Sequence, residues 1–283
     1  MSVTFYPNLI HYAGYDAAAE PTNSGETYTC SGGETTGILY DLLDNRRTNK
    51  VTWDTNGETV TTTVKIDTTA SMSCDFAIID NHNLNTAGAD FDIEQGGSNI
   101  TLASSYSGTL GSELSADSSA GEPDADGITL VKFTDAADTQ WEIEIDDVDA
   151  GFNADIYIGE IVLGNYYAIT QNPELQPNFD YDLPGSSYRE SDGGQRYGFS
   201  THENERRRWR LTWKYLNDTQ KLTLETNVFK FTRGVKYPFY IDLSGPLGNT
   251  SPTLYYVRFM RPLQFIGLTK DAWQVTMDIE EEI

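Results

Sequence analysis

A chain of 283 residues exceeds the usual size of one domain, and its 38% hydrophobic and 12% aromatic content suits a core in each of two domains. The formal net charge of -24 opposes binding to nucleic acid or to anionic membranes. No apolar run approaches the roughly 18 residues of a membrane-spanning helix, and "MSVTFYPNLIHYAGY" lacks the regions of a signal peptide. We therefore expect a chain that is made in the cytoplasm and does not insert into a membrane.

Acidic residues are concentrated in the first part of the chain. Residues 1–165 contain 5 Lys+Arg against 28 Asp+Glu, whereas residues 166–283 contain 14 against 15. After Gly164 the alternation of apolar residues stops and prolines appear. We predict two domains, at residues 1–165 and 166–283.

Period-two alternation of apolar and polar residues, together with 24 Gly, predicts an all-β fold. In "WEIEIDD", Trp141, Ile143 and Ile145 are expected to point inward. The polar, Gly/Ser-rich segment Ser104–Gly127 is expected to be a surface loop. The strands predicted before residue 165 are Thr59–Asp67, Ser73–Asp80, Ile128–Phe133, Trp141–Asp147 and Asp155–Gly164.

The stretch "RRRWRLTWKY" is predicted to be a strand with two different faces. The apolar face consists of Trp209, Leu211, Trp213 and Tyr215, and the cationic face of Arg206, Arg208, Arg210 and Lys214. We expect the tryptophan face to close the core and the cationic face to be a subunit interface that meets acidic surface on a neighbouring subunit. The alternative is a solvated face that pairs within the chain with Glu203 and Glu205.

The residues around this strand predict one helix in a module that is otherwise β. "YDLPGSSYRESDGGQRYGFS" before it is expected to form a hairpin or an extended arm, and "NDTQKLTLETNVFKFTRG" after it predicts the helix. Asp218 is expected to be the N-cap of this helix and Gly234 its stop. Further strands are predicted at Tyr237–Leu243, Leu254–Met260 and Ala272–Ile283, the last with Trp273, Val275, Met277 and Ile279 on one side.

No residue pattern typical of catalysis is present. His11, His82 and His202 fall in no metalloprotease, triad or nucleophile-elbow motif. Abundant carboxylates do not by themselves define an acid/base pair. We assign no catalytic residues and expect no enzyme. Cys30 and Cys74 lack metal-binding spacing, and we interpret them as reduced packing residues, the alternative being a single disulfide.

Two weaker patterns concern binding. "DADG" (Asp124–Gly127) and "DDVD" (Asp146–Asp149) are oxygen-rich enough for calcium, but neither has a full calcium-binding loop. Solvated loops are therefore favoured, and no cofactor is assigned. A set of aromatic residues could stack on sugar rings as a glycan contact, with packing in the core or in turns as the alternative. This set is Tyr12, Tyr15, Trp53 and Tyr106.

The first module resembles the galactose-binding-like, discoidin-type jelly roll over residues 5–165. The resemblance is carried by "GILYDLLDNRRTNKVTW", "TVKIDTTASMSCDFAIIDNHNL" and "WEIEIDDVDAGFNADIYIGEIVLG". The matching residues are Leu42, Leu43, Asp44, Trp53, His82, Asn83 and Leu84. These residues mostly maintain the fold, so the resemblance implies a jelly-roll β-sandwich and does not by itself imply a function.

The second module resembles phage minor tail and distal tail proteins over residues 175–283. The resemblance is carried by "RRWRLTW", "FKFTRGVKYPFYI", "YYVRF" and "WQVTMDIEEEI" in that order. It implies a tail-tube-like β-sandwich with one flanking helix. In the best-known distal tail arrangement the tube-like domain comes first, and the reversed order here leaves the position in a ring open.

Together the two resemblances imply a structural virion protein of a tailed phage. They imply a ring-shaped homo-oligomer at the tail tip or baseplate, located in the virion tail. The implied partners are the tail tube, hub and receptor-binding proteins, together with a host surface glycan. The alternatives are a stand-alone carbohydrate-binding lectin or adhesin, and a capsid decoration or adaptor protein.

Overall fold

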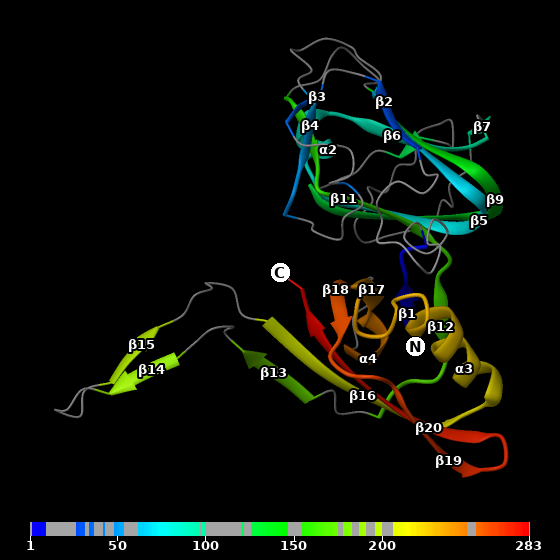
Figure 1. Ribbon diagram of the computed structural model, residues 1–283, viewed down its shortest axis with the longest axis vertical. Coiled ribbons are helices and arrows are strands. Elements are labelled where there is room, and N and C mark those ends of the chain that lie inside the picture. The colour runs from blue at the N-terminus through cyan, green and yellow to red at the C-terminus, as the bar shows by residue number, and fades with distance from the viewer. Residues whose placement is uncertain are drawn as a thin grey trace. The chain divides into compact units, whose positions relative to one another are not determined.

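The computed structural model divides the chain into two compact units, residues 6–166 and residues 1–5 with 167–283 (Figure 1). The residues it describes are 2–9, 27–31, 34–36, 42, 48–53, 62–96, 98–99, 120–121, 126–146, 154–174, 178–182, 187–190, 196–199, 206–247 and 253–282. Most of the expected loop Ser104–Gly127 lies outside them. No helix in the described ranges is long and apolar enough to cross a membrane.

The N-terminal unit is built from curled antiparallel sheets (Figure 1). Its larger sheet has the order β11-β5-β9-β6-β7, with β2 beside β5 and β8 beside β6. These strands are β2 (Thr27–Ser31), β5 (Thr62–His82), β6 (Asp90–Gln95), β7 (Ser98–Asn99), β8 (Ala120–Gly121), β9 (Gly127–Asp146) and β11 (Glu160–Gly164). The smaller sheet is β10 (Ile156–Ile158), β4 (Val51–Trp53) and β3 (Glu34–Thr36), and the helix α2 spans Leu84–Ala87.

The alternating residues of β9 lie as their sequence pattern predicts. Trp141, Ile143 and Ile145 are buried, and they pair in register with the apolar face of β5, where Ile66 is opposite Trp141 and Val64 opposite Ile143. The sequence predicted shorter strands separated by polar residues, whereas β5 and β9 are continuous through these residues. Register shifts in their pairing accommodate the polar residues. The result is an all-β unit with an apolar interior, as predicted.

The described residues of the C-terminal unit form an eight-stranded sheet. Its order is β12 (Tyr167–Ile169), β1 (Val3–Tyr6), β17 (Phe239–Asp242), β18 (Leu254–Phe259), β20 (Ala272–Glu281), β16 (Arg206–Leu216) and β13 (Asn178–Asp182), and β19 (Gln264–Thr269) pairs with β20. A two-stranded sheet of β14 (Ser187–Glu190) and β15 (Arg196–Phe199) forms the hairpin expected in the arm segment. A short helix, α4, spans Ser244–Leu247.

The first strand of the chain lies in the C-terminal unit, unlike the division expected at residues 1–165 and 166–283. Val3 and Phe5 are fully buried in the core of this unit, and Val3 is opposite Ile169 in the antiparallel pairing of β1 with β12. A four-residue strand carries too little local pattern to say which sheet it joins. Its assignment follows from the tertiary pairing.

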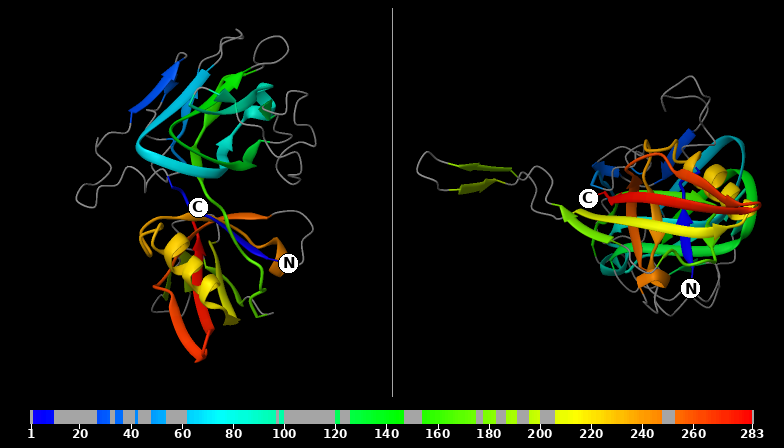
Figure 2. Two further views of the ribbon diagram at one scale, coloured as in Figure 1. Left: turned by 90° about the vertical axis from the view of Figure 1, so that its right-hand side faces the viewer. Right: turned by 90° about the horizontal axis from the view of Figure 1, so that it is seen from below.

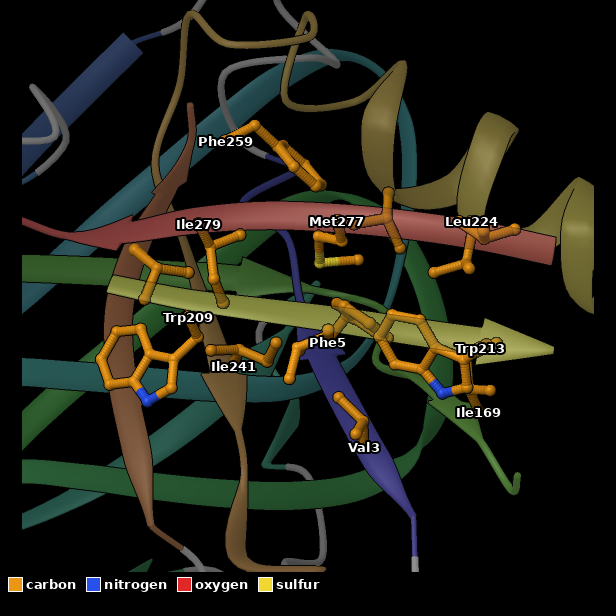
Figure 3. Packing of buried hydrophobic residues seen from close by; sticks show 14 of the residues in the cluster. Val3, Phe5, Ile169, Trp209, Trp213, Leu224, Ile241, Phe259, Met277 and Ile279 are labelled. Carbon is orange, nitrogen blue, oxygen red and sulfur yellow. The ribbon is translucent and has the colours of Figure 1, made fainter. Parts of the chain in front are cut away.

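One apolar cluster holds the C-terminal unit together (Figure 3). Trp209 and Trp213 of β16 are buried in it, as predicted, beside Met277 and Ile279 of β20. Phe5 lies 6.4 Å from Trp213 between ring centroids. The inward face predicted for the last strand is confirmed, because Val275, Met277 and Ile279 are all buried and Trp273 packs against the cluster.

The predicted helix forms, and it changes type along its length. It consists of α3 (Asp218–Leu222) followed by a π-helical segment, Thr223–Phe229, that lies against one face of the sheet (Figure 2). The N-cap is Asn217 and not Asp218, because Asn217 and Gln220 form a reciprocal capping box. The helix ends at Phe229, with Lys230 as its C-cap, and not at Gly234 as expected. Gly234 lies in the turn that follows, where its φ is 68° and its N–H donates to the Phe229 carbonyl at 2.8 Å.

Tyr215 does not lie on the tryptophan face, contrary to the prediction from parity. Its φ is +65°, and the pairing of β16 with β20 shifts register between Trp213 and Leu216. The bulge reverses the alternation, so that Tyr215 is exposed and Leu216 is buried.

Candidate functional site

The cationic face of β16 lies directly opposite acidic residues of β20. Arg208 is in register with Glu280 and Arg210 with Asp278. Arg208 Nε lies 2.5 Å from Glu280 Oε2, and Arg206 Nη1 lies 3.1 Å from Glu280 Oε1. Glu280 therefore receives two guanidinium groups from the same strand.

Asp278 also binds two guanidinium groups. Arg210 Nε lies 2.7 Å from Asp278 Oδ1, and Arg261, which follows β18, pairs with Oδ2 of the same carboxylate. The hydrogen bond to Asp278 raises the pKa of Arg210 above its usual value. A hydrogen bond to Glu174 likewise raises the pKa of Lys214. The four predicted interface cations thus share one strand, and each has a carboxylate partner within the chain.

These pairs refine the sequence interpretation of the cationic face. The partners come from β20 and from Glu174, whereas Glu203 and Glu205, the partners considered from sequence, lie outside the described residues. The alternation in "WQVTMDIEEEI" could have identified these partners from sequence, because it places Asp278 and Glu280 on the face opposite Met277 and Ile279. About half of the Arg210 side chain is exposed to solvent. The role of the cationic face at a subunit interface stays a prediction.

The aromatic residues proposed for glycan contact do not form a site in the described residues. Trp53, in the short strand β4, is 1% exposed and cannot stack on a ligand. Tyr12, Tyr15 and Tyr106 lie outside the described residues. Packing in the core is therefore the role of Trp53.

The "HNL" residues at the end of β5 hold neighbouring segments together. Leu84 N–H donates to His82 Nδ1 at 3.2 Å, so the proton of the neutral ring is on Nε2, which donates to Thr129 Oγ1 at 2.9 Å. Asn83 donates to the Asp155 carbonyl at 2.8 Å and accepts from Tyr157 N–H at 2.7 Å. These contacts agree with a fold-maintaining role for the motif.

The environment of His82 favours its neutral form. Burial lowers the pKa of His82 from 6.5 to about 4, although the charge of Asp126 acts in the opposite direction. Both ring nitrogens are engaged in hydrogen bonds. This histidine is accordingly a structural residue, whereas His11 and His202 lie outside the described residues.

Two buried carboxylates missed by the sequence analysis face each other across a strand pair. Asp80 of β5 and Glu160 of β11 are partners in register and are both fully buried. Asp80 Oδ1 accepts from Asn81 N–H at 2.7 Å. Two carboxylates supply fewer oxygens than calcium requires. Across the described ranges no group of three or more His, Cys, Asp or Glu side chains is placed to hold a metal ion.

The segments considered for calcium are only partly described. Asp126 of "DADG" is exposed, and its carboxylate accepts from Thr86 N–H at 2.9 Å. In "DDVD" only Asp146 falls within the described residues, as the last residue of β9. Among the cysteines, Cys74 is buried and forms no disulfide bond within the described residues.

No family model and no curated protein matches the chain. The chain is similar to a CBM32 domain from Clostridium perfringens in complex with GalNAc-β-1,3-galactose, at 11% identity and a TM-score of 0.34, over 49% of this chain and 94% of that one. It is also similar to the family 32 CBM of C. perfringens NanJ in complex with galactose, at 12% identity and a TM-score of 0.36, over 58% of this chain and 99% of that one. A chitosan-binding module from Paenibacillus sp. IK-5 matches at 12% identity and a TM-score of 0.35, over 49% of this chain and 93% of that one. Nothing in these comparisons supports the resemblance to phage tail proteins.

Proposed function

We propose that this chain is a non-catalytic protein whose C-terminal unit attaches it to other protein subunits and whose N-terminal jelly roll binds carbohydrate. One observation carries the attachment role. Among the described residues, every large apolar side chain that is strongly exposed belongs to the C-terminal unit. These side chains are Tyr215, Leu222, Val235, Met260, Ile266 and Leu268. A partner that covers these side chains removes apolar area from water, which favours this unit as the site of contacts with other proteins.

The charge distribution supports the same division of roles. Residues 1–165 carry an excess of 23 acidic over basic residues, 28 against 5, whereas residues 166–283 are close to neutral at 15 against 14. Two acidic N-terminal units repel each other. The near-neutral unit is therefore the one suited to contacts between subunits.

The specific assembly we propose is a ring at the tail tip or baseplate of a tailed phage, in the virion, with tail tube, hub and receptor-binding proteins as neighbours. Only the resemblance of short sequence patterns in residues 175–283 supports this finer assignment. Electron microscopy of virions with a label on this chain tests it. The expected result is a label on the tail axis, and purified virions that lack the chain would contradict it.

Carbohydrate binding by the N-terminal unit is supported by its curled antiparallel β-sheets and by the galactose-binding-like resemblance of its sequence. A glycan array probed with the full chain tests it, and binding to a defined set of sugars is expected. Tyr12→Ala combined with Tyr15→Ala, and separately Tyr106→Ala, should weaken that binding without a change in melting temperature. A full chain that binds no glycan would contradict this half of the proposal.

The two halves of the proposal can fail separately. A chain that binds glycans but remains monomeric at high concentration would be a stand-alone lectin, which is the alternative from the sequence. A chain that assembles but binds no glycan would be a purely structural subunit. Sedimentation velocity and the glycan array, applied to the same preparation, distinguish these outcomes.

A further inference from the structure

We propose that residues 81–89 of the N-terminal unit, which we name the α2 turn, are an acid-sensitive switch. A proton on His82 breaks the hydrogen bond between His82 and Leu84 and opens the turn while the β-sheets stay folded. The turn joins β5 to β6, and its helix α2 has only four residues (Figure 1). A helix this short is not stable by itself in water, so its conformation depends on contacts with residues outside it.

His82 provides one of these contacts, and only its neutral ring fits. The side chain is 1% exposed. Its Nδ1 accepts from Leu84 N–H at 3.2 Å, and its Nε2 donates to Thr129 Oγ1 in β9 at 2.9 Å. The ring therefore connects the first residue of α2 to a neighbouring strand. Because Nδ1 must carry no proton in order to accept, the closed turn requires the neutral form of the imidazole.

A proton that reaches the ring of His82 adds to Nδ1, since Nε2 already carries one. The new N–H of the ring then faces the N–H of Leu84, and two donors cannot form a hydrogen bond with each other. A closed turn would leave both donors buried without an acceptor, which is unfavourable, whereas an open turn exposes both to water. Acid therefore favours the open turn.

The backbone at the two ends of the α2 turn is suited to a local opening. The continuous pairing of β5 with β9 runs from Phe76 to Asp80, and its register shifts before His82. Asn81 has a φ of +53°, which is unusual for a residue other than glycine, and Gly88 has a φ of +71°. Opening of the turn thus leaves the continuous part of the β5–β9 pairing intact.

The charge that acts on His82 does not change in the range where the histidine titrates. This charge is Asp126, whose carboxylate accepts from Thr86 N–H at 2.9 Å and also from the Thr86 hydroxyl. Desolvation opposes ionisation of Asp126, but the hydrogen bonds from Thr86 outweigh it and lower the pKa of this carboxyl. Asp126 is therefore ionised in both neutral and mildly acidic solution. The other ionisable groups that border the turn are Asp80, Glu160, Asp155, Tyr157 and Lys50, which lies over the Tyr157 ring.

The working range of the switch follows from the two forms of the turn. In the closed turn, burial lowers the pKa of His82 from 6.5 to about 4, although the charge of Asp126 acts in the opposite direction. The open turn exposes the ring and restores its ordinary pKa. Between these values only the open turn binds the proton, so the opening equilibrium constant is level above pH 6.5 and rises as the pH falls toward 4. From pH 7.5 to pH 5 it should rise about 25-fold.

Amide hydrogen exchange of the full chain, followed by NMR at pH 7.5 and pH 5, tests the local opening. Each rate is divided by the rate of an unprotected amide at the same pH, which gives the opening constant. The amides of Ala87 and Ala89 are the reporters, because they donate to Asn83 and Leu84 carbonyls within the turn at 2.8 and 2.9 Å. Their opening constants should rise about 25-fold at pH 5. At both pH values they should exceed those of amides in β9.

His82→Asn is the matched control variant. Its Oδ1 takes the place of Nδ1 as an acceptor for Leu84 N–H, but the side chain does not titrate. The opening constants of the reporter amides should therefore change little between the two pH values. A variant whose reporters still show the full rise would overturn the role of His82.

The wild-type chain provides two further decisions that need no variant. Reporter amides that are as protected as those of β9, and that change in parallel with them, would show that only the whole unit unfolds and would overturn the switch. A ¹H–¹⁵N correlation spectrum of the imidazole rings at pH 7.5 should show His82 with its proton on Nε2 and none on Nδ1. A proton on Nδ1 would exclude the contact with Leu84 and would overturn the proposal. Neither result bears on glycan binding or on subunit attachment.

Discussion

Arg210 and Asp278 face each other across β16 and β20, with Nε and Oδ1 2.7 Å apart, and their exposures differ widely. Asp278 is 9% exposed and holds a second guanidinium, that of Arg261, whereas Arg210 is 54% exposed. Asp278→Asn should lower the free energy of unfolding by about 1 to 3 kcal/mol, because it leaves two cations without their carboxylate. Arg210→Ala should cost less, since its charge is solvated.

Urea unfolding of the two variants at neutral pH measures this difference. The loss in Asp278→Asn should shrink in 1 M salt because screening weakens the ion pairs. Equal losses in the two variants would show that the buried carboxylate of Asp278 contributes no more to stability than its exposed partner Arg210.

The two core tryptophans differ in one hydrogen bond. Trp213 Nε1 donates to the Gln171 carbonyl at 2.9 Å, whereas Nε1 of Trp209 is buried without a hydrogen-bond partner in the described residues. Trp209→Ala and Trp213→Ala should each cost about 3 to 5 kcal/mol. Trp213→Phe should cost about 1 to 2 kcal/mol more than Trp209→Phe, because only Trp213 loses a satisfied bond.

Melting temperatures and urea midpoints of the two phenylalanine variants provide the comparison. Each change removes the same atoms from the same cluster, so volume effects largely cancel. A larger loss in Trp209→Phe would contradict the assignment of the hydrogen bond.

The start of the helix depends on the side chain of Asn217. Its Oδ1 accepts from Gln220 N–H at 2.8 Å, and Gln220 Oε1 accepts from Asn217 N–H at 3.2 Å. Asn217→Ala should lower the free energy of unfolding by about 1 kcal/mol, and Asn217→Asp should retain most of it because aspartate is also a good N-cap. Urea unfolding measures both, and an alanine variant as stable as the wild type would exclude the capping box as a source of stability.

His82 should make the chain less stable in mild acid. Because burial lowers its pKa from 6.5 to about 4, the unfolded chain binds a proton at this residue between these values and the folded chain does not. The contribution of His82 is complete above pH 6.5 and is lost as the pH falls toward 4. Between pH 7.5 and pH 5 the loss should be about 2 kcal/mol.

Many carboxylates titrate in the same range, so the measurement requires a matched variant. His82→Gln retains a side-chain donor but does not titrate. Urea unfolding of both proteins at pH 7.5 and pH 5 should show that the wild type loses about 2 kcal/mol more than the variant. Parallel losses would show that this histidine is protonated in the folded state.

The sequence by itself determined many of the strands, though not β1 or β19, and the inward faces of β9, β16 and β20. Alternation in residues 141–145 and 273–279 selects the buried side because a strand places successive side chains on opposite faces of its sheet. The same rule placed Trp209 and Trp213 in the core. It also separated the acidic and near-neutral parts of the chain, because net charge depends on composition alone.

Only the tertiary structure decided which strands meet and where a local pattern fails. Val3–Tyr6 joins the C-terminal sheet, and Asp278 and Glu280 meet the arginines of β16, because pairing between distant segments depends on packing that no local window contains. At Tyr215, where φ is positive, the alternation of buried and exposed side chains along β16 reverses. The sequence alone does not show where this reversal occurs. β19 is an edge strand because its neighbours are absent on one side among the described strands, and a strand's neighbours are set by the whole sheet and not by its own residues.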